Sequence, residues 1–408
     1  MIDYIKRDVE NLISQLTIEY SCILVSGPRQ VGKTTMLKRI KPTNMGYVSL
    51  DDLNERSLAI NDPAMFLSLH PAPVLIDEVQ YAPELFSYIK IAIDNGIPAG
   101  SFWLTGSQSF KLMKLAQESL AGRVALLHMS SLSQHELYGK GENLPFSVDL
   151  TCIQSRQANM TPADTNEIFR RIWSGSLPGH ASGKFTNRDV FYSSYIQTYI
   201  ERDIKTEIKG VDEILFSDFI RAAACRAGEM LNIHAIATDV GISDVTAKHW
   251  LHVLEKSDII FFLHPYTNNL LKRTIKTPKM YFFDTGLVAY LTRYSSSDIL
   301  LNGAINGHIL ENYVVNEIRK SYFNAGKDCL LHYYHDKDNK EIDLIIESDG
   351  LLHPIEIKKA QNTNLSMISS FDILRKATIP TGKGAILCMR ENLSALNSDN
   401  YIIPIWSI

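Results

Sequence analysis

Residues 27–34 read Gly-Pro-Arg-Gln-Val-Gly-Lys-Thr, a glycine-rich pattern typical of phosphate-binding loops. The glycines let successive backbone N–H groups point at phosphate oxygens, and a helix beginning at the loop adds the positive end of its dipole. In such a loop Lys33 reaches the β- and γ-phosphates, and the Thr34 hydroxyl is a ligand for Mg²⁺. The sequence therefore predicts a site for ATP and Mg²⁺ formed by Gly27, Pro28, Arg29, Gln30, Val31, Gly32, Lys33, Thr34 and Thr35. A chance match is the alternative, and the apolar stretch that precedes the loop argues against it.

An acidic pair follows a second apolar stretch, Val-Leu-Ile at residues 74–76. Asp77 is predicted to hold the Mg²⁺, usually through water, and Glu78 to polarise the attacking water. Asp-Glu after a strand is common by itself. The pair gains weight from the phosphate-binding loop that precedes it.

Two further positions are candidates for the same reaction. Ser107 or Gln108, after the strand expected at 101–104, is predicted to face the γ-phosphate or the attacking water; the alternative is a cap on the next helix. Arg123 is predicted to stabilise transition-state charge, acting in trans if the chain forms a homo-oligomer; the alternative is a surface arginine.

A second group of candidates lies near the C-terminal end of the sequence. Glu356 and Lys358 alternate onto one face of an expected strand, and Asp343 lies on the neighbouring one. Two carboxylates can hold Mg²⁺ and the lysine can orient water for phosphodiester attack, with Glu311 as an additional carboxylate. The pattern looks like the PD-(D/E)xK nuclease constellation. The alternatives are a cross-strand ion pair or a nuclease-like fold that only holds DNA.

The middle of the chain predicts a helix–turn–helix over residues 232–257 and a hairpin with strands at 259–263 and 279–283. The cations of this hairpin are predicted to contact DNA phosphates: Lys272, Arg273, Lys276 and Lys279. The alternatives are a protein-contact module or a lid over the nucleotide site.

Short apolar strands alternate with helices in the first third of the chain. Strands are expected at residues 22–25, 47–50, 74–76, 101–104 and 124–127, after an amphipathic helix over 3–17, which indicates a parallel sheet with both faces covered. The pattern changes near residue 138. We predict an ATPase domain at 1–140, a helical and winged-helix region at 141–300, and an α+β nuclease-like domain at 301–408.

These motifs resemble the prokaryotic AAA+-like ATPase family, whose members carry a G-P-R-Q-V-G-K-T-T loop and a D-E-[VI]-Q segment, here at residues 27–35 and 77–80. The resemblance continues through residues 104–107, 120–123, 199–204 and 279–287 and covers nearly the whole chain. It implies an α/β fold: a P-loop NTPase core of the ASCE/AAA+-like type, followed by a winged helix and a restriction-endonuclease-like region of uncertain function.

The composition of the chain limits its possible partners and its compartment. The 408 residues carry a formal net charge of -4, so nucleic-acid binding would need a local basic patch. The five cysteines are scattered without a C-x-x-C pair, and no apolar run is long enough for a membrane span, which together favour the cytoplasm. The favoured function is ATP hydrolysis coupled to nucleic-acid binding or remodelling. The alternatives are a nucleotide-dependent switch on protein partners and an ATP-gated metal-dependent nuclease.

Overall fold

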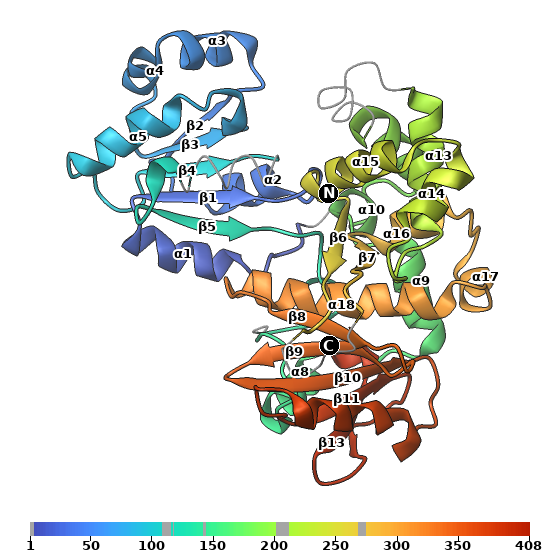
Figure 1. Ribbon diagram of the computed structural model, residues 1–408. Coiled ribbons are helices and arrows are strands. Elements are labelled where there is room, and N and C mark those ends of the chain that lie inside the picture. Colours follow the sequence, from blue (N-terminus) through green and yellow to red (C-terminus); the bar gives the residue numbers. More distant parts are fainter. Residues whose placement is uncertain (1–3, 108–115, 117, 142–143, 201–211, 268–274) are drawn as a thin grey trace.

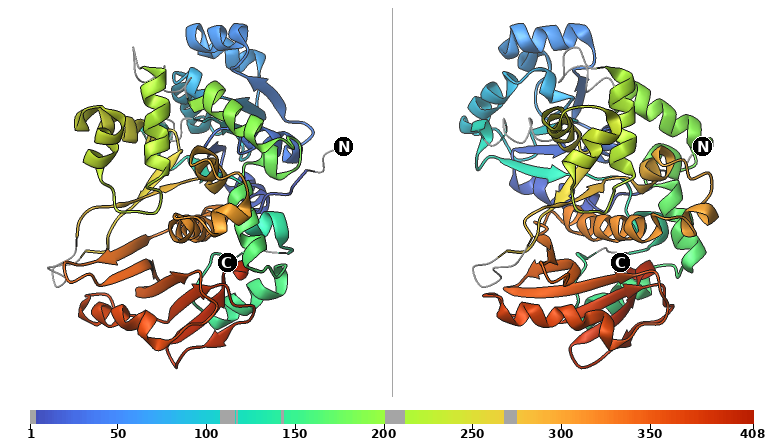
Figure 2. Two further views of the ribbon diagram at one scale, coloured as in Figure 1. Left: turned by 90° about the vertical axis from the view of Figure 1, so that its right-hand side faces the viewer. Right: turned by 45° about the vertical axis from the view of Figure 1, so that its right-hand side comes forward.

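The computed structural model describes residues 4–107, 116, 118–141, 144–200, 212–267 and 275–408. Figure 1 shows an N-terminal sheet with its helices, a group of helices beside it, and a C-terminal sheet, with the long helix α18 (Asn306–Asn324) running between the two sheets. The two views of Figure 2 show the same position for α18.

The N-terminal sheet is parallel and has the order β2-β3-β4-β1-β5. Its strands are β1 (Cys22–Ser26), β2 (Gly46–Ser49), β3 (Val74–Asp77), β4 (Phe102–Thr105) and β5 (Val124–His128). All five expected strands are present. β4 lies between β1 and β3, so the segment before Ser107 is inserted beside the strand that leads into the phosphate-binding loop.

Both faces of this sheet are covered, because alternate side chains enter two different apolar cores. Ile23, Val25 and Trp103 belong to one core, whereas Leu24 and Leu104 belong to the other. The helices of this part are α1 (Glu10–Glu19), α2 (Lys33–Ile40), α3 (Leu53–Asn61), α4 (Pro63–Leu69), η1 (Val79–Tyr81), α5 (Leu85–Asp94) and α7 (Gln134–Tyr138).

Helix α1 begins later than the amphipathic pattern predicts. Residues 4–6 are not helical, because the Glu10 carboxylate accepts hydrogen bonds from the Tyr4 hydroxyl and the Arg7 backbone N–H, and the Arg7 side chain turns inward. The expected start at residue 3 is therefore wrong by about two turns.

The middle of the chain is mainly helical, as expected. It contains α8 (Leu150–Asn159), α9 (Thr165–Ser174), α10 (Pro178–Ala181), α11 (Arg188–Tyr195), a π-helix η2 (Ile196–Ile200), α13 (Glu213–Ala224), α14 (Ile233–Val240), α15 (Asp244–Lys256), α16 (Thr285–Leu291) and α17 (Ser297–Leu301). The expected helix–turn–helix is formed by α14 and α15, with Gly241 at φ 77° in the turn and Ser243 capping α15. The hairpin strands β6 (Ile260–Leu263) and β7 (Lys279–Phe282) follow and pair antiparallel.

The C-terminal sheet is mixed and has the order β12-β13-β11-β10-β9-β8. Its strands are β8 (Leu331–His335), β9 (Glu341–Ser348), β10 (Leu351–Lys358), β11 (Gly384–Cys388), β12 (Ser394–Ala395) and β13 (Asn400–Pro404), with the 3-10 helices η3 (Leu365–Lys376) and η4 (Ile405–Ser407). The two neighbouring strands that were expected to carry Asp343 and Glu356 are the antiparallel pair β9–β10.

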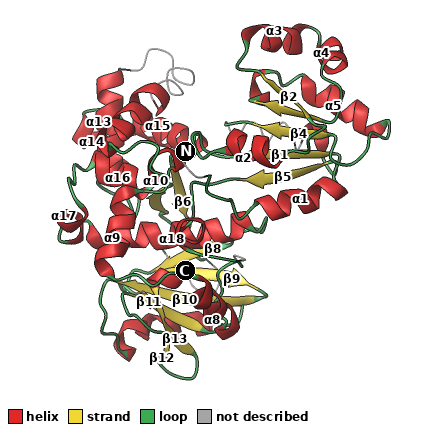
Figure 3. Ribbon diagram, turned by 180° about the vertical axis from the view of Figure 1, so that it is seen from behind, coloured by secondary structure: helices red, strands yellow, loops and turns green. Residues whose placement is uncertain are grey.

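Helix α18 connects all parts of the molecule. Most of its residues are buried, and it contacts β5 of the first sheet, α9 and α16 of the middle, and β10 of the second sheet. Figure 3 shows it from behind, between the two sheets. Within the described ranges, no helix combines the length and the apolar character needed to cross a lipid bilayer.

Candidate functional site

The loop between β1 and α2 is shaped by two glycines. Gly27 has φ 141°, and a Cβ atom there would stand 2.1 Å from the Met129 carbonyl oxygen, so only glycine fits. Gly32 has φ 92° and precedes the first turn of α2. The loop therefore curls directly over the end of β5 and delivers its backbone to the amino end of α2.

Arg7 links the loop to the segment that follows β5. Its buried guanidinium donates to the Val31 carbonyl at 2.8 Å, to the Ser130 carbonyl at 2.8 Å and to the Glu136 carboxylate at 2.9 Å. Arg7 belongs to no sequence motif, because no short-range pattern links it to the loop.

Lys33 is buried, and its ammonium donates to the carbonyl oxygens of Gly27 at 2.8 Å and Pro28 at 2.7 Å. Burial lowers the pKa of this lysine to about 8, although the charges of Glu78, Asp258 and Asp77 oppose that shift. The ammonium thus lies inside the loop, bonded to two of its backbone carbonyls. A bound phosphate would replace these carbonyls as its hydrogen-bond partner.

Thr34 and Asp77, the two residues predicted to serve Mg²⁺, lie next to each other. The Thr34 hydroxyl donates to Asp77 Oδ1 at 2.8 Å, and the Tyr47 hydroxyl donates to Asp77 Oδ2 at 3.2 Å. Burial raises the pKa of the Asp77 carboxyl, while the two hydrogen bonds lower it. Tyr47 comes from the edge strand β2, and its ring carries the Lys38 ammonium 3.6 Å from the centroid; no sequence motif pointed to it.

This pair of oxygen donors fits Mg²⁺, since a hydroxyl and a carboxylate are hard ligands of the kind this ion binds beside phosphates. Thr34 and Asp77 would hold the ion, which would supply charge neutralisation at the phosphates.

Glu78, Gln80 and Ser107 form a polar group next to Asp77. The Ser107 hydroxyl donates to Glu78 Oε2 at 3.3 Å, and the Gln80 amide donates both to that oxygen and to Ser107 Oγ, the latter at 3.2 Å. Glu78 itself has φ 56°, an uncommon backbone conformation for a glutamate that re-aims its side chain at the end of β3. Ser107 is thus brought to Glu78, whereas Gln108 lies outside the described residues. Gln80 lies in the quoted D-E-V-Q segment, but the sequence assigned it no role.

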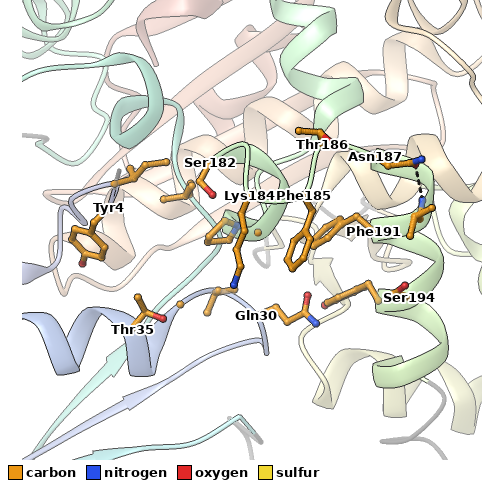
Figure 4. A pocket seen from close by; sticks show the side chains of 18 of the residues that line it. Tyr4, Gln30, Thr35, Ser182, Lys184, Phe185, Thr186, Asn187, Phe191 and Ser194 are labelled. Carbon is orange, nitrogen blue, oxygen red and sulfur yellow. Dashed lines mark hydrogen bonds between the residues drawn. The ribbon is translucent and has the colours of Figure 1, made fainter. Parts of the chain in front are cut away.

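A pocket of about 870 Å³ opens beside the loop (Figure 4). Gln30, Gly32 and Thr35 line one side, Tyr4 stands at one end, and the segment from α10 to α11 forms the opposite side. In that segment, Phe185 and Phe191 stack with ring centroids 5.8 Å apart, and Lys184 extends towards the loop (Figure 4). None of the residues from the α10–α11 segment was predicted.

Arg123 lies away from this group. It precedes β5, so it lies at the amino ends of the parallel strands, whereas the phosphate-binding loop lies at their carboxyl ends. Its guanidinium donates to Asp94 at 2.5 Å and to the Ala121 carbonyl at 3.1 Å, in an exposed position. The part of the prediction that would place Arg123 at its own chain's γ-phosphate is wrong. Action in trans stays a prediction.

The C-terminal candidates converge in part. Asp343 Oδ2 accepts hydrogen bonds from the Ile357 backbone N–H at 2.8 Å and the Lys358 ammonium at 3.1 Å, and that ammonium also contacts Glu356 at 2.5 Å. Burial and the Asp343 charge raise the pKa of Glu356 to about 9. Glu311 instead binds the Lys279 ammonium at 2.8 Å and the Tyr281 hydroxyl at 2.5 Å. In the described part of the chain, no group of three or more acidic, histidine or cysteine side chains is arranged to hold a metal.

Lys279 corrects the prediction of a cationic wing. It is buried, with its ammonium between Glu311 at 2.8 Å and Glu341 at 2.7 Å, so it does not face a DNA phosphate. The reason is that β7 packs along α18, where Asn312 receives and donates hydrogen bonds at Phe282. Lys276 is exposed. The predicted contacts at Lys272 and Arg273 lie outside the described residues.

The end of the hairpin farther from Lys279 lies beside the phosphate-binding loop. A small cavity is lined jointly by Pro28 and Val31 of the loop and by Ile259 and Phe283 at the base of the hairpin. One antiparallel pair of strands therefore extends from the phosphate-binding loop to Glu311 of α18 and Glu341 of β9.

Three family models match separate segments of the chain, and only the N-terminal one is described as more than a domain of unknown function. Residues 19–138 match a family model described as an AAA domain, and residues 165–298 and 306–408 match two models described as domains of unknown function. An uncharacterized protein of Mycobacterium tuberculosis is 26% identical over 365 residues, which are 88% of this chain and 75% of that protein. One from Methanocaldococcus jannaschii is 23% identical over 350 residues, 76% of this chain and 70% of that protein.

Two solved structures are similar at low level. The Walker-type ATPase of Pyrococcus abyssi has a TM-score of 0.44 at 16% identity, covering 71% of this chain and 96% of that one. The Holliday junction branch migration motor RuvB of Thermotoga maritima has a TM-score of 0.31 at 17% identity, covering 63% of this chain and 89% of that one.

Proposed function

We propose that this chain, in which residues 19–138 form an AAA-type P-loop ATPase domain, hydrolyses ATP with Glu78 as the base that polarises the attacking water. One observation carries the proposal. The Thr34–Asp77 hydrogen bond and the Glu78–Gln80–Ser107 group lie at the end of adjacent strands, beside the loop that carries Lys33.

Phosphate binding and activation of the water are carried out by different groups of the site. Backbone N–H groups of the loop and the amino end of α2 bind the phosphates, and Lys33 turns from the Gly27 and Pro28 carbonyls to the β- and γ-phosphates. Glu78 accepts the proton of the attacking water. Ser107 and Gln80 fix which way the Glu78 carboxylate faces.

The pocket beside the loop is the proposed nucleoside site. Its apolar and aromatic lining, with Phe185 and Phe191 at its wall, offers a surface for a base, and Tyr4 closes the other end. Lys184 would approach the phosphates from the helical side (Figure 4).

Replacing Glu78 by glutamine tests the proposal. Glu78→Gln keeps the size of the side chain and removes its charge, so ATP should bind with nearly unchanged affinity while turnover falls by about 100-fold or more, the scale of a lost general base. Glu19→Gln, an exposed position at the end of α1, is the matched control and should turn over like the wild type. Wild-type turnover in Glu78→Gln would move the base to another residue.

The proposed use of this hydrolysis is work on nucleic acid. Support comes from the α14–α15 helix–turn–helix, whose second helix exposes Lys248, His249 and His252, and from the exposed Lys276. The test is ATP turnover with and without single-stranded, duplex and branched DNA, together with the salt dependence of DNA binding. Stimulation by one DNA form supports this use. ATP-dependent capture of a protein partner with no response to DNA would support the alternative, a switch that acts on proteins.

A further inference from the structure

A second cavity, of about 440 Å³, lies on the other side of helix α11. Val190, Phe191 and Ser194 of α11 line the nucleoside pocket, whereas Asp189 and Ser193 line the second cavity. Its other walls come from the π-helix η2, from α13, and from the end of α16 with the residues that follow it. The cavity is therefore separate from the proposed nucleotide site and shares one helix with it.

Charge in this cavity is strongly unequal. Three arginines line it, Arg188, Arg221 and Arg293, against one lining carboxylate, Asp189, whose side chain is 76% exposed. Arg221 is half-exposed and shares Asp218 at 3.1 Å. The Arg293 side chain has no hydrogen-bond or ion-pair partner within the residues that the structure describes. An anion entering the cavity would meet three arginines and one carboxylate in its lining.

Arg188 carries a buried positive charge, and its guanidinium also lies over the rings of Trp173 and Tyr192, 4.2 Å and 5.4 Å from their centroids. Its guanidinium donates to the carbonyl oxygens of Trp173 at 2.9 Å and Gly286 at 3.1 Å, and to Asp189 at 3.1 Å. Two of these acceptors are neutral, and the third is the exposed carboxylate. Burial accordingly lowers the pKa of Arg188. A buried cation held mainly by neutral acceptors favours a neighbouring anion.

Uncharged donors complete the lining. Ser193, Gln197 and Ser217 contribute side chains for which no hydrogen-bond partner is found among the described residues. Two unusual backbone features lie at the same place: Gln197 belongs to the π-helix η2, and Arg293 has φ 63°. Both features occur preferentially at functional sites, where they aim side chains that a regular helix would point elsewhere.

We propose that the cavity between α11, α13 and the end of α16 binds a phosphoryl group. Guanidinium groups with serine and amide donors are the set that recognises phosphate oxygens. The volume suits a small ligand or a single phosphate with its neighbouring atoms. The group can belong to a soluble phosphorylated compound or to a nucleic-acid backbone, and a competition titration distinguishes these two sources.

The test is a calorimetric titration with inorganic pyrophosphate in the Lys33→Ala background, which removes the phosphate-binding lysine of the nucleotide loop. One saturable site is expected. Adding Arg221→Gln and Arg293→Gln together should weaken it by about tenfold or more, the effect of lost charge-assisted hydrogen bonds. Both residues are exposed, so the fold should be kept, as a thermal melt would verify. Arg170→Gln, an exposed arginine of α9 outside the cavity, is the matched control and should bind like its parent.

A second titration uses a ten-nucleotide oligothymidine. Competition with pyrophosphate, with loss of affinity in the same double variant and a steep salt dependence, identifies a nucleic-acid phosphate as the source. Pyrophosphate binding without competition identifies a soluble compound. Failure of pyrophosphate to bind saturably, or equal binding by the double variant and the Arg170→Gln control, overturns the proposal. Neither result depends on ATP hydrolysis, so the proposed function stands or falls separately.

Discussion

Lys33 shows how a single side chain can make nucleotide binding depend on pH. Burial lowers its pKa to about 8 in the free protein, below the value of an exposed lysine. The ammonium that should meet the phosphates is therefore present below pH 8 and is lost above it. We expect ATP affinity to be level between about pH 7 and 8 and to fall by up to about tenfold per unit above that.

A fluorescent ATP analogue titrated at several pH values measures this effect. The fall should disappear in Lys33→Ala, whose affinity is low at every pH. An affinity that stays level up to pH 10 in the wild type would show that the loop does not depend on the charge of this lysine.

Glu356 makes stability depend on pH in a different window. Burial, and next the Asp343 charge, raise its pKa to about 9 in the folded chain from an ordinary value of 4.5. Its contribution to stability is fully present below about pH 4.5 and is lost as the pH rises towards 9, because the folded state must then hold a buried carboxylate. Glu356→Gln should therefore gain in melting temperature relative to the wild type as the pH rises through this window.

Melting curves from pH 5 to 9 decide this point. Glu391→Gln, an exposed position after β11, is the control and should track the wild type. A constant difference between Glu356→Gln and wild type across the window would contradict a raised pKa. A Mg²⁺- or Mn²⁺-dependent DNA cleavage that is present in wild type and lost in Glu356→Gln would favour the nuclease alternative.

The β6–β7 hairpin is the element in which the structure departs most from the expected role. Periodicity predicted both strands, but the burial of Lys279 follows from contacts with α18 and β9, far away in sequence. Lys279→Met removes one partner of a buried ion pair and leaves Glu311 uncompensated. We expect a loss of about 3–5 kcal/mol in the free energy of unfolding.

A second change separates charge from packing. Glu311→Gln in the Lys279→Met background removes the stranded carboxylate, and it should restore part of the lost stability. Denaturant unfolding of the two single variants and the double variant measures the coupling. Additive losses would mean that Lys279 stabilises the hairpin by packing alone.

Sequence patterns predicted elements better than contacts between elements. The parallel strands and the loop 27–34 were predictable, because apolar runs and the glycine spacing are local signals. Thr34 and Asp77 could be paired in advance, since both follow parallel strands that end at the same edge. Tyr47 and Phe185 could not, because their roles depend on how β2 and the α10–α11 segment pack around the loop.

In an assembly of several chains, Arg123 could contribute to ATP turnover at the loop of a neighbouring copy. It lies at the amino ends of the parallel strands, away from its own chain's loop, and is paired with the exposed Asp94. If it acts in trans, mixing Arg123→Ala with Lys33→Ala subunits should restore part of the ATP turnover, because some interfaces then join an intact loop to an intact arginine. The measurement is turnover of mixtures shown to co-assemble by light scattering; no gain in such mixtures would assign Arg123 a structural role.

The apolar core extends across the whole molecule rather than ending at the domain limits. Trp103 of the first sheet, Phe219 of the helical part and Ile357 of the C-terminal sheet belong to one continuous cluster of buried side chains. Natural exchange of these parts with those of other proteins is constrained by this continuity. A recombination event that brought the ATPase part to a new C-terminal sequence would also have to supply matching apolar surface for its sheet. We therefore expect the three parts to be inherited together, and point changes along α18 to be compensated in more than one of them.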